Sequence, residues 1–225
     1  ALGTDRKLYI YNEGAVFDIT PIRETQALTN PFTTNGTTTV SVADTSHNAI
    51  QGDFVTFDSF SSIDGLDMNQ EFEITSITDA NNYTVTHTST ASGSTSGGGG
   101  SGNAKYQINV GPATSTYGLG WGTDTWSSGT WGTASSASDV VIVGRNWSLD
   151  NFGEDLIATV LDGGTFIWDT SGGLASRATA LSNAPTASRF SIVSTDTRHL
   201  LIFGTETTIG TPDTQDDLFF RFSDR

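Results

Sequence analysis

Apolar and aromatic residues lie in short runs along the chain, separated by turn residues. The first two runs cover residues 7–11 and 15–19, with Asn12-Glu13-Gly14 between them. Two such runs joined by a three-residue turn that contains Gly are typical of a β-hairpin, and Pro21 helps to end the second strand. The pattern therefore predicts an antiparallel hairpin at the start of the chain.

The same pattern recurs further along the chain. Residues 155–161 and 165–170 form a second copy, joined by Asp162-Gly163-Gly164. Further hairpin material occupies residues 189–193, 199–204 and 218–222. Antiparallel hairpins that recur at wide spacing are typical of a propeller or a sandwich. We predict an all-β fold whose main domain is a partial, β-propeller-like set of hairpins.

A block of different character separates the two hairpin copies. It holds four short runs, at residues 38–42, 54–57, 72–77 and 83–87. Apolar residues alternate with Thr, Ser and Glu in each run, as in a sheet with one solvated face. Ile77 is out of phase with Ile74, which predicts a β-bulge. The core of this block is predicted to consist of Val40, Val42, Val55, Phe57, Phe72, Ile74, Tyr83 and Val85.

This organisation predicts three parts. Residues 29–91 form a small β-barrel or sandwich inserted into a loop, and residues 92–104 form a Gly/Ser-rich flexible segment with few side chains to offset its ordering entropy. Residues 1–28 and 105–225 form the main domain. Its roughly 150 residues amount to three to four blades of about 40–50 residues each, at or below the smallest closed propeller. The main domain is therefore expected to be incomplete, whether the chain is a fragment or a product completed by neighbouring molecules.

Composition and charge favour strands and argue against nucleic acid as a bound partner. The chain has 36 Thr and 25 Ser among 225 residues, together with 25 Gly. Thr is β-branched, Ser competes for backbone hydrogen bonds and Gly loses the most backbone entropy, so helices are disfavoured. The net charge of −15 would repel a phosphate backbone. DNA is expected at most to pass through a lumen without specific binding.

The sequence also limits metal, cofactor and membrane chemistry. Cysteine is absent, which excludes disulfides, thiolate metal sites and a cysteine nucleophile. The three His residues, His47, His87 and His199, are too scattered to suggest a metal cluster. No run approaches the roughly 20 apolar residues of a membrane span. We expect no metal, no cofactor and no membrane insertion.

Acidic residues offer the strongest case for an enzyme, and the case is weak. Paired carboxylates can hydrolyse glycosides or bind calcium. Acidic loops are more often simply solvated, the EF-hand pattern is absent, and no Gly-x-Ser-x-Gly elbow or His-based triad occurs. We therefore expect no catalytic residue and no enzymatic activity. The carboxylates concerned are Asp150, Glu154 and Asp155, with Asp213, Asp216 and Asp217 near the end of the chain.

A Trp-rich loop is the most distinctive local feature. Trp121, Trp126 and Trp131 are spaced by five residues within the Gly-rich stretch 120–132. Exposed Trp rings stack on sugars or fill pockets in a partner, and they also pack Gly-rich loops against a domain or a sister subunit. We take these three residues as candidate ligand or assembly contacts, with both readings open.

Several stretches together resemble a known family. They are Leu8-Tyr9-Ile10 leading to residues 18–23, the Trp-Gly loop 120–132, residues 150–156 running into Phe166-Ile167-Trp168-Asp169, and a His-x-x-x-x-Gly-Asp-x-Val-Thr-Phe pattern at residues 47–57 followed by Asn81-Asn82-Tyr83-Thr84-Val85. In these features the chain resembles the large β-rich structural proteins of tailed bacteriophages, the tail or nozzle-type virion components. The motifs are structural turns, and the family's members are generally longer.

The resemblance implies a function in the virion. A tail component of nozzle, tube or hub type acts by assembly rather than by catalysis, as a ring or tube of copies in contact with other tail proteins. An acidic, Lys-poor, Thr/Ser-rich β surface suits such a part. The alternative is a module that binds a carbohydrate or a host surface through the Trp-rich loop.

Overall fold

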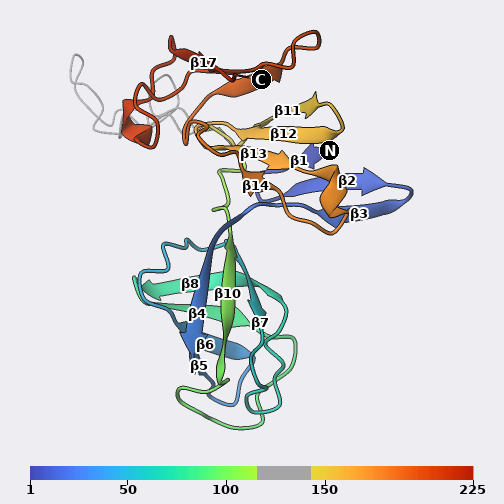
Figure 1. The fold of residues 1–225 in the computed structure, drawn as a ribbon. Coiled ribbons are helices and arrows are strands. Elements are labelled where there is room, and N and C mark those ends of the chain that lie inside the picture. Colours follow the sequence, from blue (N-terminus) through green and yellow to red (C-terminus); the bar gives the residue numbers. More distant parts are fainter. Residues whose placement is uncertain (116–142, 225) are drawn as a thin grey trace, which may run out of the picture. The chain divides into compact units, whose positions relative to one another are not determined.

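The computed structural model describes residues 1–115 and 143–224, which form an all-β fold (Figure 1). These ranges contain four antiparallel sheets and two short 3₁₀ turns, η1 (Thr170–Gly172) and η2 (Pro212–Thr214). The predicted all-β class is confirmed. Within the described ranges, no helix is long and apolar enough to cross a membrane.

The chain divides into two compact units. Unit 1 comprises Ala1–Phe17, Gly111–Ser176 and Ala180–Arg225, and unit 2 comprises Asp18–Val110 with Arg177–Thr179. Unit 2 contains the block of alternating runs, and unit 1 contains the recurring hairpins. Each unit is described separately below.

Unit 2 is built on one seven-stranded antiparallel sheet. The sheet order is β4-β10-β7-β8-β9-β6-β5. The four predicted runs correspond to four of these strands, and the register shift between Ile74 and Ser76 is the predicted bulge. The strands are β4 (Ile22–Thr29), β5 (Phe32–Thr33), β6 (Thr39–Ala43), β7 (Phe54–Asp58), β8 (Glu71–Asp79), β9 (Asn82–Thr86) and β10 (Ser101–Gln107).

The core of unit 2 follows the predicted alternation. One cluster joins seventeen buried side chains, and all eight of the residues predicted from the alternating pattern belong to it. Phe32 contacts Phe57 and Phe60 edge to face, with ring centroids 5.0 and 4.8 Å apart. A cluster of this size gives unit 2 a hydrophobic core of its own. Its burial stabilises the unit, since each Å² of apolar surface removed from water contributes about 25 cal/mol.

The sheet of unit 2 curls back on itself at Phe32. Beyond the ladder that joins β5 to β6, Phe32 forms a bridge with Gly98, and Thr34 donates a backbone hydrogen bond to Thr95. Asn30 also donates to Gly100, directly before β10 begins. At this point the sheet comes close to the predicted barrel through one bridge and the adjoining hydrogen bonds. No full ladder between the described strands closes it.

The Gly-rich stretch expected to be flexible is a packed part of this unit. Residues 101–107 form β10, which pairs with β4 on one side and β7 on the other. A Cβ atom added to Gly99 would lie 2.5 Å from Cδ2 of Phe32, and one added to Gly98 would lie 2.6 Å from Cδ1 of Ile63. Glycine occurs here because the backbone approaches core side chains closely, a reason that composition alone does not reveal.

The boundaries of unit 2 differ from the predicted boundaries at residues 29, 91 and 105. β4 and β10 pair from Thr29 and Ser101 to Ile22 and Gln107, so the unit extends to Asp18 and Val110 (Figure 1). β4 reads Ile-Arg-Glu-Thr-Gln-Ala-Leu-Thr and has no fully buried residue. Its weak apolar pattern is the physical reason that the sequence did not predict this strand.

Unit 1 contains most of three small sheets. Their orders are β1-β2-β3, β11-β12-β13-β14 and β15-β16-β17. The hairpins β2/β3, β12/β13 and β15/β16 occur where the sequence predicts them, whereas β11 was not predicted. The propeller arrangement stays a prediction. The strands are β1 (Leu2–Gly3), β2 (Leu8–Asn12), β3 (Ala15–Asp18), β11 (Trp147–Phe152), β12 (Asp155–Val160), β13 (Thr165–Trp168), β14 (Thr179–Ala180), β15 (Phe190–Val193), β16 (Leu200–Phe203) and β17 (Phe220–Phe222).

Two of these sheets pack against each other through a small apolar cluster. Ile157 of β12 packs with Val193, Leu200 and Ile202 from β15 and β16. Beside this cluster, the hydroxyl of Thr159 lies 3.0 Å from that of Thr165 and 2.7 Å from that of Ser191. Because these buried hydroxyls form hydrogen bonds with one another, the interior does not incur the free-energy cost of burying an unpaired polar group.

Candidate functional site

The sheet β15-β16-β17 presents an outer face made of six apolar side chains. Its strand register aligns Phe190, Phe203 and Phe220 in one row across the sheet and Ile192, Leu201 and Phe222 in the next. Successive side chains of a strand point to opposite faces, so these six share one face. The opposite face carries Val193, Leu200 and Ile202, which are buried in unit 1. We call the six residues the apolar face.

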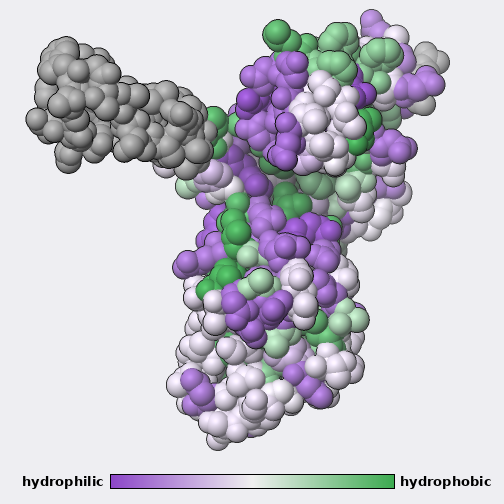
Figure 2. Space-filling model, turned by 90° about the vertical axis from the view of Figure 1, so that its left-hand side faces the viewer, coloured by the Kyte–Doolittle hydropathy of each residue, from purple (hydrophilic) through white to green (hydrophobic). Residues whose placement is uncertain are grey.

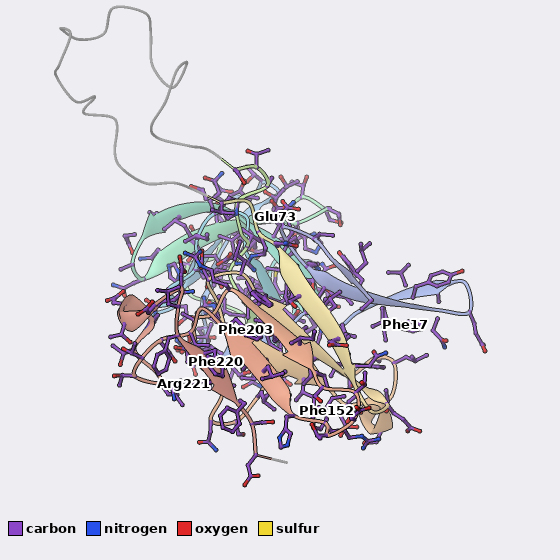
Figure 3. The ribbon with its side chains drawn as sticks, turned by 90° about the horizontal axis from the view of Figure 1, so that it is seen from above. Phe17, Glu73, Phe152, Phe203, Phe220 and Arg221 are labelled. Atoms are coloured by element: carbon purple, nitrogen blue, oxygen red, sulfur yellow. The ribbon has the colours of Figure 1, made fainter. Side chains whose placement is uncertain are left out.

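The aromatic row of the apolar face is stacked. The rings of Phe190 and Phe203 have centroids 4.7 Å apart and an interplanar angle of 12°. Phe203 and Phe220 follow at 6.1 Å and 25°. Figure 3 shows Phe203 and Phe220 beside each other, with Arg221 next along β17. Cross-strand aromatic contacts of this kind stabilise a sheet and hold the rings in fixed positions.

Much of the apolar face is open to solvent. Phe190 is 49% exposed, Phe220 55% and Phe222 69%. Leu218, just before β17, is 93% exposed. In Figure 2 several hydrophobic side chains lie along the upper surface of unit 1, the side of this unit on which Figure 1 draws β17. Strands that are apolar on both faces are ordinarily covered on both.

Side chains of β11 occupy one edge of this sheet. The carboxylate of Asp150 accepts a hydrogen bond from the Val193 N–H at 2.7 Å, and the Ser148 hydroxyl donates to the Ser191 carbonyl at 2.6 Å. These contacts satisfy main-chain groups on the free side of β15. They block strand pairing at that edge, which is a common protection against aggregation.

Charged residues hold the loops around the apolar face. Arg189 donates to Asp217 at 2.7 Å and to Asp162 at 2.5 Å. The hydrogen bond and the charge of Arg189 lower the pKa of the Asp217 carboxyl, and the bond to Asp217 raises the pKa of the Arg189 guanidinium. Arg221 donates to the carbonyls of Glu206 and Thr207, and its guanidinium lies 5.1 Å from the Phe219 ring centroid.

A buried carboxylate anchors the loop that precedes β17. Burial alone would raise the pKa of Glu206, but hydrogen bonds from the Thr186 N–H and hydroxyl and from the Gly210 N–H outweigh burial and lower it. The carboxylate is therefore charged and bound by main-chain donors. It has a structural role, since its hydrogen bonds tie residues 186 and 210 together.

The predicted carboxylate clusters are used in structural contacts. Asp150 accepts from Val193 and Asn151, and Asp155 accepts from the Thr170 N–H at 3.0 Å. In the second cluster, Asp216 accepts from the Leu218 N–H, Asp217 pairs with Arg189, and Asp213 lies in the first turn of η2. Glu154 is exposed in the turn between β11 and β12. These contacts explain the acidic composition largely as turn and loop chemistry.

The three histidines also serve local structure. Nδ1 of His47 accepts from the Ala49 N–H, and Nδ1 of His87 accepts from the Ser89 N–H in the same way. Nδ1 of His199 lies 2.9 Å from the Ser223 carbonyl. Among the residues with described positions, no group of three or more His, Asp or Glu is placed to hold a metal ion.

Trp121, Trp126 and Trp131 lie outside the described residues. The sequence does not mark the apolar face as a site, because residues 189–193, 199–204 and 218–222 predict only hairpin strands. Leu200-Leu201-Ile202-Phe203 is apolar at four successive positions, and this signal distinguishes a strand with two apolar faces from one with a solvated face.

Comparisons with known proteins give a weak similarity in structure and none in sequence. No family model matches the sequence, and no curated protein matches it. Among solved structures, the chain is similar to the phage phi92 endosialidase, with a TM-score of 0.34 and 13% sequence identity. The similarity covers 90% of this chain and 32% of that chain, so this chain spans about a third of the length of that protein.

Proposed function

We propose that this chain is a structural component of a bacteriophage tail, of nozzle, tube or hub type, that acts by assembly and not by catalysis. The resemblance in sequence motifs supports the phage setting and the virion location. The apolar face supports assembly, because a large exposed apolar patch commonly marks a surface that a partner covers. The partners proposed are further copies of the chain, in a ring or tube, and neighbouring tail proteins.

The distribution of exposed apolar side chains carries this proposal. In the described ranges, eleven of the twelve exposed large hydrophobic side chains belong to unit 1, and the exception is Ile50 of unit 2. Unit 2 buries seventeen core side chains in one cluster, whereas the cluster under the apolar face has four. Unit 2 therefore completes its own core, while unit 1 displays the apolar surface that an assembly would cover.

The net charge fits a part that lines or surrounds a passage for DNA. A chain with charge −15 repels phosphate, so DNA would slide past an acidic inner wall without binding to it. The same charge makes a ring of copies depend on short-range apolar contacts, since like charges oppose association at long range.

Sedimentation velocity and electron microscopy of the purified chain test the proposal. We expect concentration-dependent assembly into a ring or tube that the double variant Phe190→Ser/Phe220→Ser abolishes. Ile50→Ser is the matched control, because Ile50 is 48% exposed on the other unit, and it should assemble like the unchanged chain. A chain that stays monomeric at all concentrations, or variants that assemble equally, would contradict assembly through the apolar face.

The alternative is a module that binds a carbohydrate or a host surface through Trp121, Trp126 and Trp131. It stays a prediction, because the three residues lie outside the described ranges. Binding on a glycan array that disappears in the triple Trp→Ala variant would favour it, and the absence of binding would count against it.

A further inference from the structure

The loop between β5 and β6 contains the one Asn-Gly pair of the sequence, Asn35-Gly36. Each of the other eleven Asn residues precedes a residue that has a side chain. In an Asn-Gly pair the main-chain nitrogen of Gly can approach the side-chain carbonyl carbon of Asn, because Gly has no Cβ and the widest choice of backbone angles. The pair is therefore predisposed to a reaction between the Asn side chain and the main chain.

The fold leaves both reacting groups of this pair accessible. Asn35, Gly36 and Thr37 are all exposed to solvent. Within the described ranges, the Gly36 N–H has no hydrogen-bond acceptor in the protein. The space beside it is open, since a Cβ added to Gly36 would first meet the Gly93 carbonyl oxygen at 3.9 Å. Water and hydroxide can therefore reach this nitrogen, and it need not break a hydrogen bond within the protein in order to react.

A neighbouring hydroxyl activates the carbonyl that the nitrogen would attack. The Thr37 hydroxyl donates a hydrogen bond to Oδ1 of Asn35 at 2.6 Å. Attack at Cγ turns this oxygen into an oxyanion, so a donor that already points at it stabilises the charge that develops. The Thr39 N–H donates to the same hydroxyl at 3.2 Å, and the Ala91 N–H donates to the Thr37 carbonyl at 3.0 Å. These contacts hold the hydroxyl beside the amide.

The two Asp-Gly pairs of the sequence could form the same ring, but the fold restrains both. In one pair the Gly163 N–H donates to the Val160 carbonyl at 3.0 Å, so the nitrogen is already engaged. In the other pair both carboxylate oxygens of Asp64 accept hydrogen bonds, from the hydroxyls of Thr34 and Thr95. That carboxylate cannot turn freely toward the next main-chain nitrogen. The fold therefore disfavours the reaction at both Asp-Gly pairs.

We propose that Asn35 is a site of spontaneous deamidation, which converts it through a succinimide into aspartate and isoaspartate. The Gly36 nitrogen loses its proton to water or hydroxide and attacks Cγ of Asn35. The bond from Cγ to the side-chain nitrogen breaks, and that nitrogen takes up a proton and leaves as ammonia. Water then opens the ring: cleavage between Cγ and the ring nitrogen gives aspartate, and cleavage between the main-chain carbonyl and that nitrogen gives isoaspartate. Water is the co-reactant, and nothing is oxidised or reduced.

The reaction changes the surface of unit 2 and leaves its core in place. Each event adds one negative charge to a chain that already carries −15. The isoaspartate product also adds one carbon atom to the main chain between β5 and β6. Because Asn35 is exposed and outside the core cluster, the unit stays folded. The products do not revert to asparagine, so the modified fraction rises with the age of the protein. This inference is independent of the proposed assembly.

Peptide mapping by mass spectrometry tests the proposal on the folded full chain, stored at mildly alkaline pH and sampled over time. The peptide that contains Asn35 should gain the mass difference between an oxygen atom and an NH group and should separate into aspartate and isoaspartate forms. It should react faster than every other Asn peptide. Asn35→Gln is the control and should stay unmodified over the same time, because its ring would be six-membered and forms more slowly. Reaction at Asn35 no faster than at the other Asn residues would overturn the proposal.

Two further variants test the mechanism. Thr37→Val keeps a β-branched side chain but removes the donor to Oδ1, and it should slow the reaction about two- to tenfold, the rate equivalent of one hydrogen bond. Gly36→Ala places a methyl group beside the attacking nitrogen and should also slow the reaction, while the open space around residue 36 lets the variant fold. Unchanged rates in both variants would overturn the mechanism. Deamidation of Asn35 in urea but not in the folded chain would show that the fold protects it, and would overturn the proposal.

Discussion

Tyr106 donates a hydrogen bond from its phenol to the buried carboxylate of Asp44, at 2.5 Å. The Tyr83 hydroxyl lies 2.8 Å from that of Tyr106, so three buried polar side chains form one chain inside unit 2. Burial raises the pKa of Asp44 above its ordinary value, although the bond from Tyr106 opposes that rise. Unit 2 therefore contains a carboxyl group whose ionisation opposes folding.

Asp44→Asn is expected to stabilise unit 2 at neutral pH by about 1 kcal/mol, because it removes a buried charge and keeps an acceptor for Tyr106. The folded chain holds the Asp44 proton more tightly than the unfolded chain does. Asp44 therefore lowers the free energy of unfolding as the pH rises above 3.8. The gain from Asp44→Asn should be seen in urea unfolding at pH 7 and should shrink toward pH 4.

Asp44→Ala is the control for this prediction. It leaves the buried Tyr106 hydroxyl without its acceptor and should destabilise unit 2 by about 1–3 kcal/mol. A lower unfolding midpoint for Asp44→Asn than for the unchanged chain at pH 7 would show that the charged pair stabilises the fold.

The turn between β8 and β9 should give the opposite pH dependence. Hydrogen bonds from the Asn81 N–H and the Asn82 side chain lower the pKa of Asp79. A carboxyl with a lowered folded pKa contributes stability above its ordinary value of 3.8, and this contribution is lost as the pH falls through the folded pKa. The urea midpoint for unfolding of unit 2 should decrease as the pH is lowered below 4. The decrease should be less steep in Asp79→Asn. Equal slopes for the two proteins would refute this role of Asp79.

The five Trp residues make the two units separable in such measurements. All five lie in the ranges of unit 1, and the core of unit 2 contains Tyr83 and Tyr106. Tryptophan fluorescence therefore reports unfolding of unit 1, while hydrogen exchange of the amides in strands such as β9 and β10 reports unit 2. Substitutions at Asp44 and Asp79 should leave the fluorescence transition unchanged.

Gly99→Ala should destabilise unit 2 by about 2–4 kcal/mol, because the residue has φ +98° and its Cβ would lie 2.5 Å from the Phe32 ring. Gly36→Ala is the matched control in the same unit. Gly36 has φ +75°, but its Cβ would meet its nearest neighbour only at 3.9 Å, so the cost should be about 1 kcal/mol. Equal losses in urea unfolding would mean that backbone strain, and not contact with Phe32, requires glycine at residue 99.

Asp150→Ala should destabilise unit 1 by about 1 kcal/mol, since the Val193 N–H loses its acceptor. The exposed edge of β15 should also promote aggregation. Fluorescence-monitored unfolding and light scattering measure the two effects. Glu154→Ala, in the neighbouring exposed turn, should change stability by less than about 0.5 kcal/mol. If the unchanged chain cleaved a polysaccharide and these substitutions abolished that cleavage, the carboxylates would be catalytic.

The fold was predictable where strand character is local. Val40, Val42, Tyr83 and Val85 alternate with polar residues in register, and all four are buried. β4 could not be predicted in this way, because its stability comes from pairing with β10, about 80 residues away in the chain. Local composition misled at Gly99, where glycine makes room for Phe32 and does not form a linker.

The candidate site was predictable only in part. The apolar runs that contain Phe190, Phe203 and Phe220 were recognised as strands, but the row they form depends on the register of three strands. Register follows from turn geometry and packing, which one sequence does not specify. The carboxylate contacts of Asp150 and Asp155 were equally hidden, since their partners are main-chain groups on other strands.

The side-by-side pairing of β4 and β10 means that the chain enters and leaves unit 2 at neighbouring points, Ile22 and Gln107. Near these two points Arg177 forms an ion pair with Asp18 at 2.6 Å, and the Ala178 N–H donates a hydrogen bond to the Ile19 carbonyl. A domain whose two ends lie side by side can be replaced by a domain with a different surface without changing the path of the rest of the chain. The paired ends of unit 2 therefore meet the geometric condition for inserting a domain into a loop.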